Sequence, residues 1–132
     1  MAAADTNVLL RLLLDDDPEQ ARAARSFQRA HAPLFVSHVV LAELAWVLAS
    51  GYRFPRQRLG ALLEMLLDTD GFALQEPNVV QAALAHHRAS TAEFSDCLIL
   101  AIAQSAAATP LGTFDRSLGR LAGVQRLGRR AR

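Results

Sequence analysis

The sequence predicts a mixed α/β fold in which helices cover both faces of a mainly parallel sheet. Short apolar segments of strand length alternate along the chain with longer segments whose apolar residues recur at helical spacing. Such alternation is typical of a parallel sheet, because each crossover between parallel strands carries a helix. The chain has 132 residues, one domain's length, and its 52% hydrophobic content is enough to build a core. We therefore expect a single domain spanning residues 1–132.

The first elements are a very short strand and two helices. Residues 2–4 can form at most a brief strand, and residues 6–14 form a short apolar helix that stops near the acidic run 15–17. Asp17 is the expected N-cap of the next helix, because Pro18 then stands at its first position. This helix is amphipathic to residue 32. Its predicted buried face carries Ala21, Ala24, Phe27 and either Ala30 or His31.

The middle of the chain repeats the pattern of strand and helix. Residues 33–37 form a short strand, after which Ser37 caps an almost wholly apolar helix that ends at Gly51 and carries Glu43. A further helix covers residues 54–70. Its apolar stripe consists of Leu59, Leu62, Leu63, Leu66 and Leu67.

The last part of the chain alternates again. The expected elements are a strand at 72–75, helices at 77–90 and 90–108, a strand at 110–114, a short helix at 115–123 and a strand at 124–127. The single cysteine, Cys97, lies in an apolar helix and is expected in the core. One cysteine excludes an internal disulfide and fits the reducing cytoplasm. No apolar run approaches the ~18 residues of a membrane span, so no membrane partner is expected.

Acidic residues follow the predicted strands or lie on the helices that start beside them. Asp5 comes directly after residues 2–4, and Asp115 comes directly after residues 110–114. The helices that carry Glu43 and Asp96 start at the same edge of the predicted sheet, where ligands of parallel sheets bind. Four converging carboxylates repel one another unless a cation lies among them. A hard divalent ion such as Mg²⁺ or Mn²⁺, which prefers oxygen ligands, meets that need.

Each acid also has a structural interpretation. Asp5 and Asp115 could be ordinary helix N-caps, Asp96 could favour the dipole of its helix, and Glu43 could point to solvent. Glu93, with Ser90 three residues earlier, matches the capping box S-x-x-E. Only the joint pattern favours a functional site.

Other residues carry weaker signals. The run Asp15–Asp17 resembles a metal cluster but is better explained as a solvated turn. The basic tail 126–132 could bind a phosphate backbone or stay solvated. Trp46 belongs to the core or to a dimer face. The histidines form no ligand pattern and are expected at the surface or in ordinary packing; they are His31, His38, His86 and His87.

The charge composition excludes several chemistries. The net charge is +1, so no strong basic field indicates a nucleic-acid binder. All fourteen basic residues are arginine, and the absence of lysine excludes P-loop phosphate binding, Schiff-base catalysis and lysine-assisted aspartyl-phosphate chemistry.

Four segments in order resemble the PIN-domain family, particularly the VapC toxins of bacterial toxin–antitoxin pairs. They are DTNVLLRLLLDDDPEQA at the start, VSHVVLAELAWVL around Glu43, EFSDCLILAIA around Asp96 and GTFDRSLGRLAGVQRL around Asp115, where Thr113 and Asp115 match a Thr-x-Asp pattern. The resemblance covers nearly the whole chain. It implies a three-layer α/β/α fold with a five-stranded, mainly parallel sheet.

The same resemblance implies a metal-dependent endoribonuclease, a hydrolase that uses Mg²⁺ or Mn²⁺. Asp5, Glu43, Asp96 and Asp115 would be its catalytic acids, and Asp5, Asp96 and Asp115 would be its metal ligands. The residues implied to orient these acids are Thr6, Asn7, Glu93 and Thr113, and Glu93 stands where the family frequently has aspartate. A homodimer, an RNA substrate and a cognate antitoxin are implied as partners.

The expected reaction is hydrolysis of an RNA phosphodiester by a metal-activated water, with Glu43 or Asp96 receiving the proton. Arg116, next to Asp115, could hold the substrate backbone. A DNase and a metal-dependent phosphatase are alternative enzymes. An alternative of another class is a module that binds RNA or protein without cleaving it.

Overall fold

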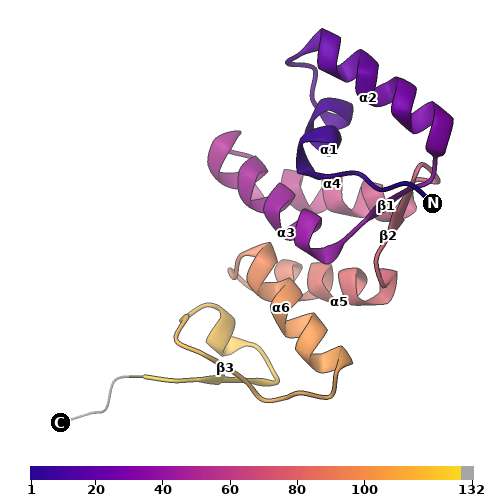
Figure 1. Ribbon diagram of the computed structural model, residues 1–132. Helices are drawn as coiled ribbons and strands as arrows, with labels where there is room; N and C mark the ends of the chain where they lie inside the picture. Colours follow the sequence, from indigo (N-terminus) through magenta and orange to yellow (C-terminus); the bar gives the residue numbers. More distant parts are fainter. Residues whose placement is uncertain (129–132) are drawn as a thin grey trace. The chain divides into compact units, whose positions relative to one another are not determined.

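The computed structural model describes residues 1–128 and divides the chain into two compact units (Figure 1). Unit 1 is Met1–Pro77, and unit 2 is Asn78–Arg132, of which residues 78–128 are described. The described residues form six α-helices and four short strands, and every strand pairing is parallel. The predicted class, a mixed α/β fold with parallel strands, is confirmed. That residues 1–132 form one domain stays a prediction.

The strands of unit 1 form a small parallel sheet. Strand β1 (Leu34–Val36) pairs with β2 (Phe72–Leu74), with Leu34 opposite Phe72 and Val36 opposite Leu74. Ala3 adds a single parallel bridge to Phe35, so residues 2–4 form the very short strand segment that the sequence predicts. Because the three segments run in the same direction, the residues that follow them share one edge of the sheet.

Helices α1 (Thr6–Leu13), α2 (Pro18–His31), α3 (His38–Trp46) and α4 (Arg56–Asp68) surround this sheet in unit 1. Two predicted caps are confirmed: Asp17 accepts a hydrogen bond from Gln20 N at 3.1 Å, and Ser37 Oγ accepts one from Val40 N at 3.1 Å. Helix α3 continues as one wide turn, η1 (Val47–Gly51), and ends at Gly51 as expected. The fully buried side chains of unit 1 include Leu9, Leu34, Val36, Leu41, Leu44, Leu48, Leu63 and Leu66.

The acidic run after α1 is a solvent-facing turn held by local partners. Asp16 forms an ion pair with Arg11 at 3.1 Å and accepts a hydrogen bond from the Tyr52 hydroxyl at 2.9 Å. Asp17 is occupied as the cap of α2. Of the two interpretations of this run, the structure favours the turn.

Unit 2 contains two helices and a second pair of strands. Helix α5 (Pro77–Arg88), which begins at the last residue of unit 1, is followed by α6 (Phe94–Ser105). Strand β3 (Leu111–Thr113) pairs in parallel with β4 (Val124–Arg126). Between these strands only a short 3₁₀ turn, η2 (Leu118–Arg120), forms within the helix expected at 115–123. The fully buried side chains here include Phe94, Cys97, Leu100 and Val80, which confirms Cys97 as a core residue.

Two glycines make the turn between β3 and β4 possible. A Cβ atom on Gly119 would lie 2.7 Å from Arg126 Cβ, so only glycine lets the Arg126 side chain lie across η2. Gly123 has φ +84°, a left-handed conformation that favours glycine, directly before β4. The loop that follows Asp115 is therefore folded back tightly onto the strand pair.

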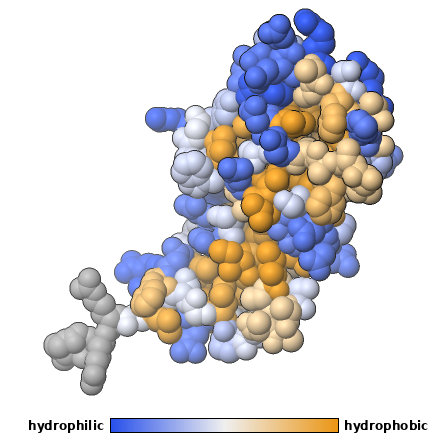
Figure 2. Space-filling model, viewed as in Figure 1, coloured by the Kyte–Doolittle hydropathy of each residue, from blue (hydrophilic) through white to orange (hydrophobic). Residues whose placement is uncertain are grey.

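Several apolar side chains reach the surface (Figure 2). Trp46 is 61% exposed, which excludes the core and leaves the dimer face of its two interpretations. Phe27, expected on the same face of α2 as Ala21 and Ala24, is 37% exposed. The buried face of α2 is narrower than predicted, because the buried residues of this helix are Ala21 and Ala24 alone. A wide apolar stripe is unnecessary there because small side chains let α1 and α2 pack closely.

The histidines behave as ordinary packing and surface residues. His38 is buried, and its ring Nε2 lies 2.9 Å from the carbonyl oxygen of Gln75, whose side chain accepts a hydrogen bond from His38 N. His86 Nε2 lies 2.8 Å from Gln104 Oε1 on α6, and the exposed His31 ring lies against Phe27. The prediction for the basic tail falls largely on residues 129–132, which lie outside the described part of the chain.

Candidate functional site

Asp5 stands at the carboxyl edge of the unit 1 sheet, where α1 begins. Its backbone is extended, with φ −89° and ψ 180°, and its Oδ1 accepts a hydrogen bond from Val8 N at 2.9 Å. Asp5 is therefore the N-cap of α1, and its side chain is exposed. The interpretation of Asp5 as a helix N-cap is thus correct.

Glu43 is tied to the residue next to Asp5. The buried Thr6 donates a hydrogen bond from Oγ1 to Glu43 Oε1, which joins the start of α1 to the middle of α3. Glu43 is thus held by the residue that follows Asp5, which the sequence analysis expected to orient the acids. Glu43 itself is exposed, which agrees with the interpretation that it points to solvent. Helix α3 is apolar almost all round, yet one side of it remains at the surface.

Asp96 lies in the first turn of α6, where its side chain is partly buried. Partial burial raises the pKa of its carboxyl group, and the neighbouring charges of Asp115 and then Glu93 raise it further. A helix N-terminus favours a carboxylate by about 0.3–1 kcal/mol, so desolvation and repulsion together outweigh the dipole here. Within residues 1–128 the Asp96 carboxylate receives no hydrogen bond that would offset this repulsion.

Glu93 is not part of a capping box. Helix α6 begins at Phe94, with Glu93 at the N-cap position but without a hydrogen bond from its side chain. The hydroxyl of Ser90 instead donates to the carbonyl oxygen of His86 at 2.7 Å and accepts from Ala92 N at 3.2 Å. The matched S-x-x-E pattern fails because Ser90 closes the end of α5 rather than the start of α6. Glu93 is exposed and acts on Asp96 through its charge.

Asp115 is positioned by two hydrogen bonds at the carboxyl end of β3. Its backbone N donates to Thr113 Oγ1 at 3.0 Å, and its Oδ2 accepts from Leu118 N at 2.7 Å. Thr113 therefore orients Asp115, as the sequence resemblance implied, and the Asp115 carboxylate caps the turn η2. Arg116, the next residue, is exposed, as is Asn7 in unit 1.

Carboxylate chemistry fits a hard cation, although no complete site is formed. Among residues 1–128, no three His, Cys, Asp or Glu side chains form a group that could hold a metal ion. In unit 2, however, the charges of Asp115 and Glu93 act on the half-buried Asp96, and a divalent cation would relieve that repulsion. The donor set of unit 2 is thus chemically suited to Mg²⁺ or Mn²⁺.

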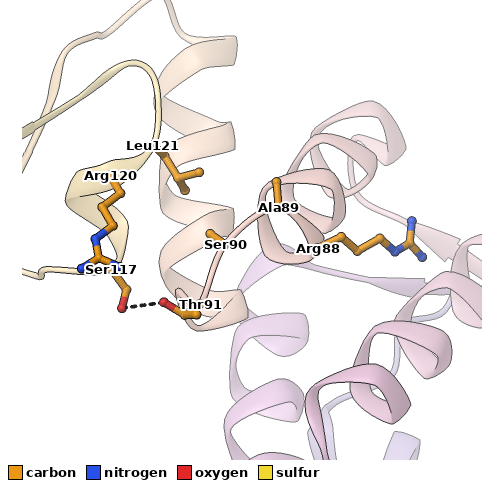
Figure 3. A pocket seen from close by; sticks show the side chains of 7 residues that line it. All are labelled: Arg88, Ala89, Ser90, Thr91, Ser117, Arg120 and Leu121. Carbon is orange, nitrogen blue, oxygen red and sulfur yellow. Dashed lines mark hydrogen bonds between the residues drawn. The ribbon is translucent and has the colours of Figure 1, made fainter.

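Unit 2 also contains a pocket of about 400 Å³ (Figure 3). It is formed by the loop between α5 and α6 and by the turn η2, and it is lined by Arg88, Ala89, Ser90, Thr91, Ser117, Arg120 and Leu121. The sequence analysis did not single out Ser117 or Arg120. One arginine among fourteen and one serine in a loop carry no sequence signal that would have distinguished them.

Comparison with known proteins identifies the family. The family model described as PIN domain matches residues 2–124 of this chain. The chain belongs to the PIN-domain family. PIN domains are nuclease-type domains, and the match spans the first three segments on which the sequence resemblance rests and the fourth as far as residue 124. No curated protein and no solved structure matches the chain.

The helices of this PIN domain are all short. Among the described residues, none is long and apolar enough to cross a membrane.

Proposed function

We propose that this PIN domain is an Mg²⁺- or Mn²⁺-dependent endoribonuclease and the toxin of a toxin–antitoxin pair. The observation that carries the proposal is the raised pKa of the Asp96 carboxyl group, caused by its partial burial and by the charges of Asp115 and Glu93. Carboxyl groups whose pKa is raised by burial and by neighbouring charges are found at functional sites. The family match, to a nuclease-type domain, supports the same chemistry.

Asp5, Asp96 and Asp115 are the proposed metal ligands. Each follows a strand or starts a helix, which holds its backbone in place, and Asp5 and Asp115 are fixed further by the hydrogen bonds they accept from Val8 N and Leu118 N. When bound, the ion would supply a Lewis acid that polarises the phosphodiester and lowers the pKa of a nearby water. We propose also that the strands of both units belong to one five-stranded sheet in a three-layer α/β/α domain spanning 1–132.

The protein's own groups are proposed to orient the reactants and move the proton. Thr6 holds Glu43 Oε1, which leaves Oε2 to take a proton from the attacking water. The water oxygen attacks phosphorus, the bond from phosphorus to O3′ breaks, and the leaving 3′ oxygen takes a proton from solvent, to which Glu43 later returns the proton that it received. The products are a 5′-phosphate and a 3′-hydroxyl. Thr6, Asn7, Glu93 and Thr113 would position the acids, and Arg116 would contact the substrate backbone.

The first experiment replaces Asp96 with asparagine. Cleavage of single-stranded RNA in Mg²⁺ or Mn²⁺ should fall by at least roughly 10²-fold, because an amide neither ligates a hard cation well nor accepts a proton. Asp70→Asn, an exposed aspartate of unit 1, is the matched control and should keep full activity. Full metal-dependent cleavage by a folded Asp96→Asn protein would overturn the assignment.

Substrate class is tested on the same protein. Single-stranded DNA and a small phosphate monoester should be cleaved poorly compared with RNA, and preference for either would indicate the DNase or the phosphatase instead. Metal binding without cleavage of any RNA tested would indicate the non-cleaving module.

Partners and location complete the proposal. Co-expression with the neighbouring reading frame should give a complex and relieve growth arrest, because an antitoxin arginine would fit an acidic site. A cytoplasmic homodimer is proposed as well, supported by the exposure of Trp46, an aromatic residue of the kind enriched at interfaces. Sedimentation of the purified protein would show a single monomer species if the dimer is wrong.

A further inference from the structure

The pocket of unit 2 combines cationic and hydroxyl donors in the arrangement that a phosphate group needs. Figure 3 shows the Arg120 side chain running toward Ser117, and the backbone N of Arg120 donates to the carbonyl oxygen of Ser117 at 3.3 Å. The tight turn η2 therefore keeps these two residues together on one wall of the pocket. An exposed guanidinium presents several N–H donors in a planar fork that matches phosphate oxygens.

The hydroxyl of Ser117 is oriented by its neighbour across the pocket. Thr91 Oγ1 donates to Ser117 Oγ at 3.0 Å, the contact drawn in Figure 3. Because Ser117 Oγ accepts the hydrogen bond from Thr91, the hydroxyl hydrogen of Ser117 can donate to another group. Ser117 and Arg120 together thus give an anion one neutral and one charged donor. The Arg88 guanidinium points away from Ser117 in Figure 3, so we assign it no role in this pocket.

The pocket is built from the same two chain segments that carry the acids of unit 2. Thr91 lies two residues before Glu93, and Ser117 lies two residues after Asp115. A group bound by Ser117 and Arg120 is therefore held by the loops that also carry Glu93 and Asp115. Leu121 and Ala89 add apolar surface to the lining, against which a sugar or base could pack.

We propose that this pocket binds a phosphate of the RNA backbone, next to the phosphate that is cleaved, through Arg120 and Ser117. A basic pocket beside an acidic metal site would fix the register of a polyanion that the acids alone would repel. This inference rests on the proposed function for the identity of the polyanion, and it adds a subsite formed by residues outside the acidic constellation.

The test measures binding rather than cleavage. An Asp5→Asn background, altered only in unit 1, silences the proposed hydrolysis, and fluorescence anisotropy follows a labelled single-stranded RNA at several salt concentrations. Arg120→Ala should weaken binding roughly tenfold and lower the salt dependence by about 0.7 in the slope of log K against log salt, as expected for the loss of one phosphate contact to a single strand. Arg120→Lys should restore the slope but not the full affinity, because lysine keeps the charge without the fork.

Matched controls separate the pocket from general charge effects. Arg22→Ala removes an exposed arginine of α2 and should change affinity and slope much less than Arg120→Ala. Ser117→Ala should weaken binding a fewfold with the slope unchanged, since it removes a neutral donor. Equal effects of Arg120→Ala and Arg22→Ala in folded proteins would overturn the proposal. Arg120-dependent binding of inorganic phosphate without Arg120-dependent binding of RNA would overturn the assignment to RNA.

The two proposals fail in different ways. If the unaltered chain cleaves no RNA but Arg120 still governs RNA affinity, the nuclease assignment is wrong and the phosphate pocket stands. If the chain cleaves RNA but Arg120→Ala behaves as Arg22→Ala does, the pocket is wrong and the nuclease assignment stands.

Discussion

Asp5 in unit 1 and Asp96 in unit 2 both lie at the start of a helix, yet their surroundings differ. Asp5 is exposed and accepts a hydrogen bond from Val8 N, so its negative charge is used by the fold. Asp96 is half-buried, and the charges of Asp115 and Glu93 raise the pKa of its carboxyl group beyond the effect of burial alone. An aspartate at a helix start therefore stabilises unit 1 through the hydrogen bond that it accepts. In unit 2 the charge of Asp96 is unfavourable, because other acids repel it.

This difference separates what each unit contributes to the proposed site. In unit 1 hydrogen bonds hold the acids in place: Asp5 accepts one from Val8 N, and Glu43 accepts one from Thr6. In unit 2 the acids are brought close enough to repel one another, and only a cation or a proton relieves that repulsion. The carboxylates of unit 1 are thus oriented by hydrogen bonds, whereas those of unit 2 repel one another.

The largest expected effect comes from the cores of the two units. Leu63 on α4 and Leu100 on α6 are both fully buried, and truncation of either to alanine should lower the free energy of unfolding by about 2–5 kcal/mol. If residues 1–132 are one domain, both variants should shift the same single urea transition. Two transitions, each moved by only one of the substitutions, would show that the units unfold independently and that the one-domain prediction is wrong.

A smaller effect distinguishes the role of Asp5 as an N-cap from its proposed catalytic role. Asp5→Ala should lower stability by about 1 kcal/mol, whereas Asp5→Asn should keep most of it, because asparagine is also a good N-cap. Both variants should lose metal-dependent cleavage of RNA. Chemical denaturation and a cleavage assay on the same samples check the prediction. An Asp5→Asn protein with full cleavage would leave Asp5 with a structural role alone.

The smallest expected effect is a dependence of stability on pH at Asp96. Because the pKa of this carboxyl group is raised in the folded state, its charge destabilises the metal-free fold once the pH exceeds the folded pKa. Asp96→Asn should therefore raise the melting temperature in EDTA at neutral pH. The gain should vanish at acidic pH, below the pKa of an unfolded aspartate, where the carboxyl group is protonated in both states.

Two further measurements check that interpretation. Asp70→Asn, at an exposed position, should show little change with pH in the same titration. Added Mg²⁺ should stabilise the unaltered chain more than the Asp96→Asn variant. Equal melting temperatures of the Asp96→Asn protein and the unaltered chain across this pH range would contradict a strained Asp96.

Rules that consider only neighbouring residues predicted the order of helices and strands. They failed where one side chain could form a hydrogen bond with either of two elements. The caps Asp17 and Ser37 were predictable because each stands between a turn and an apolar run, with no other partner nearby. Ser90 also precedes an apolar run, yet it does not cap α6. Its hydroxyl instead donates to the His86 carbonyl oxygen at the end of α5. The 3₁₀ turn η2 is shorter than the predicted helix because Gly119 and Gly123 favour a tight return to β4.

The sequence by itself determined the succession of helices and parallel strands, the candidate acids and the family. These follow from apolar periodicity, capping residues and motif order, which are properties of neighbouring residues. Only the tertiary structure decided that Glu43 and Trp46 face outward, that Thr6 holds Glu43, that Asp115 and Glu93 act on Asp96, and that Ser117 and Arg120 line a pocket. Burial and electrostatic coupling depend on distances between residues far apart in the chain, and no local pattern encodes those distances.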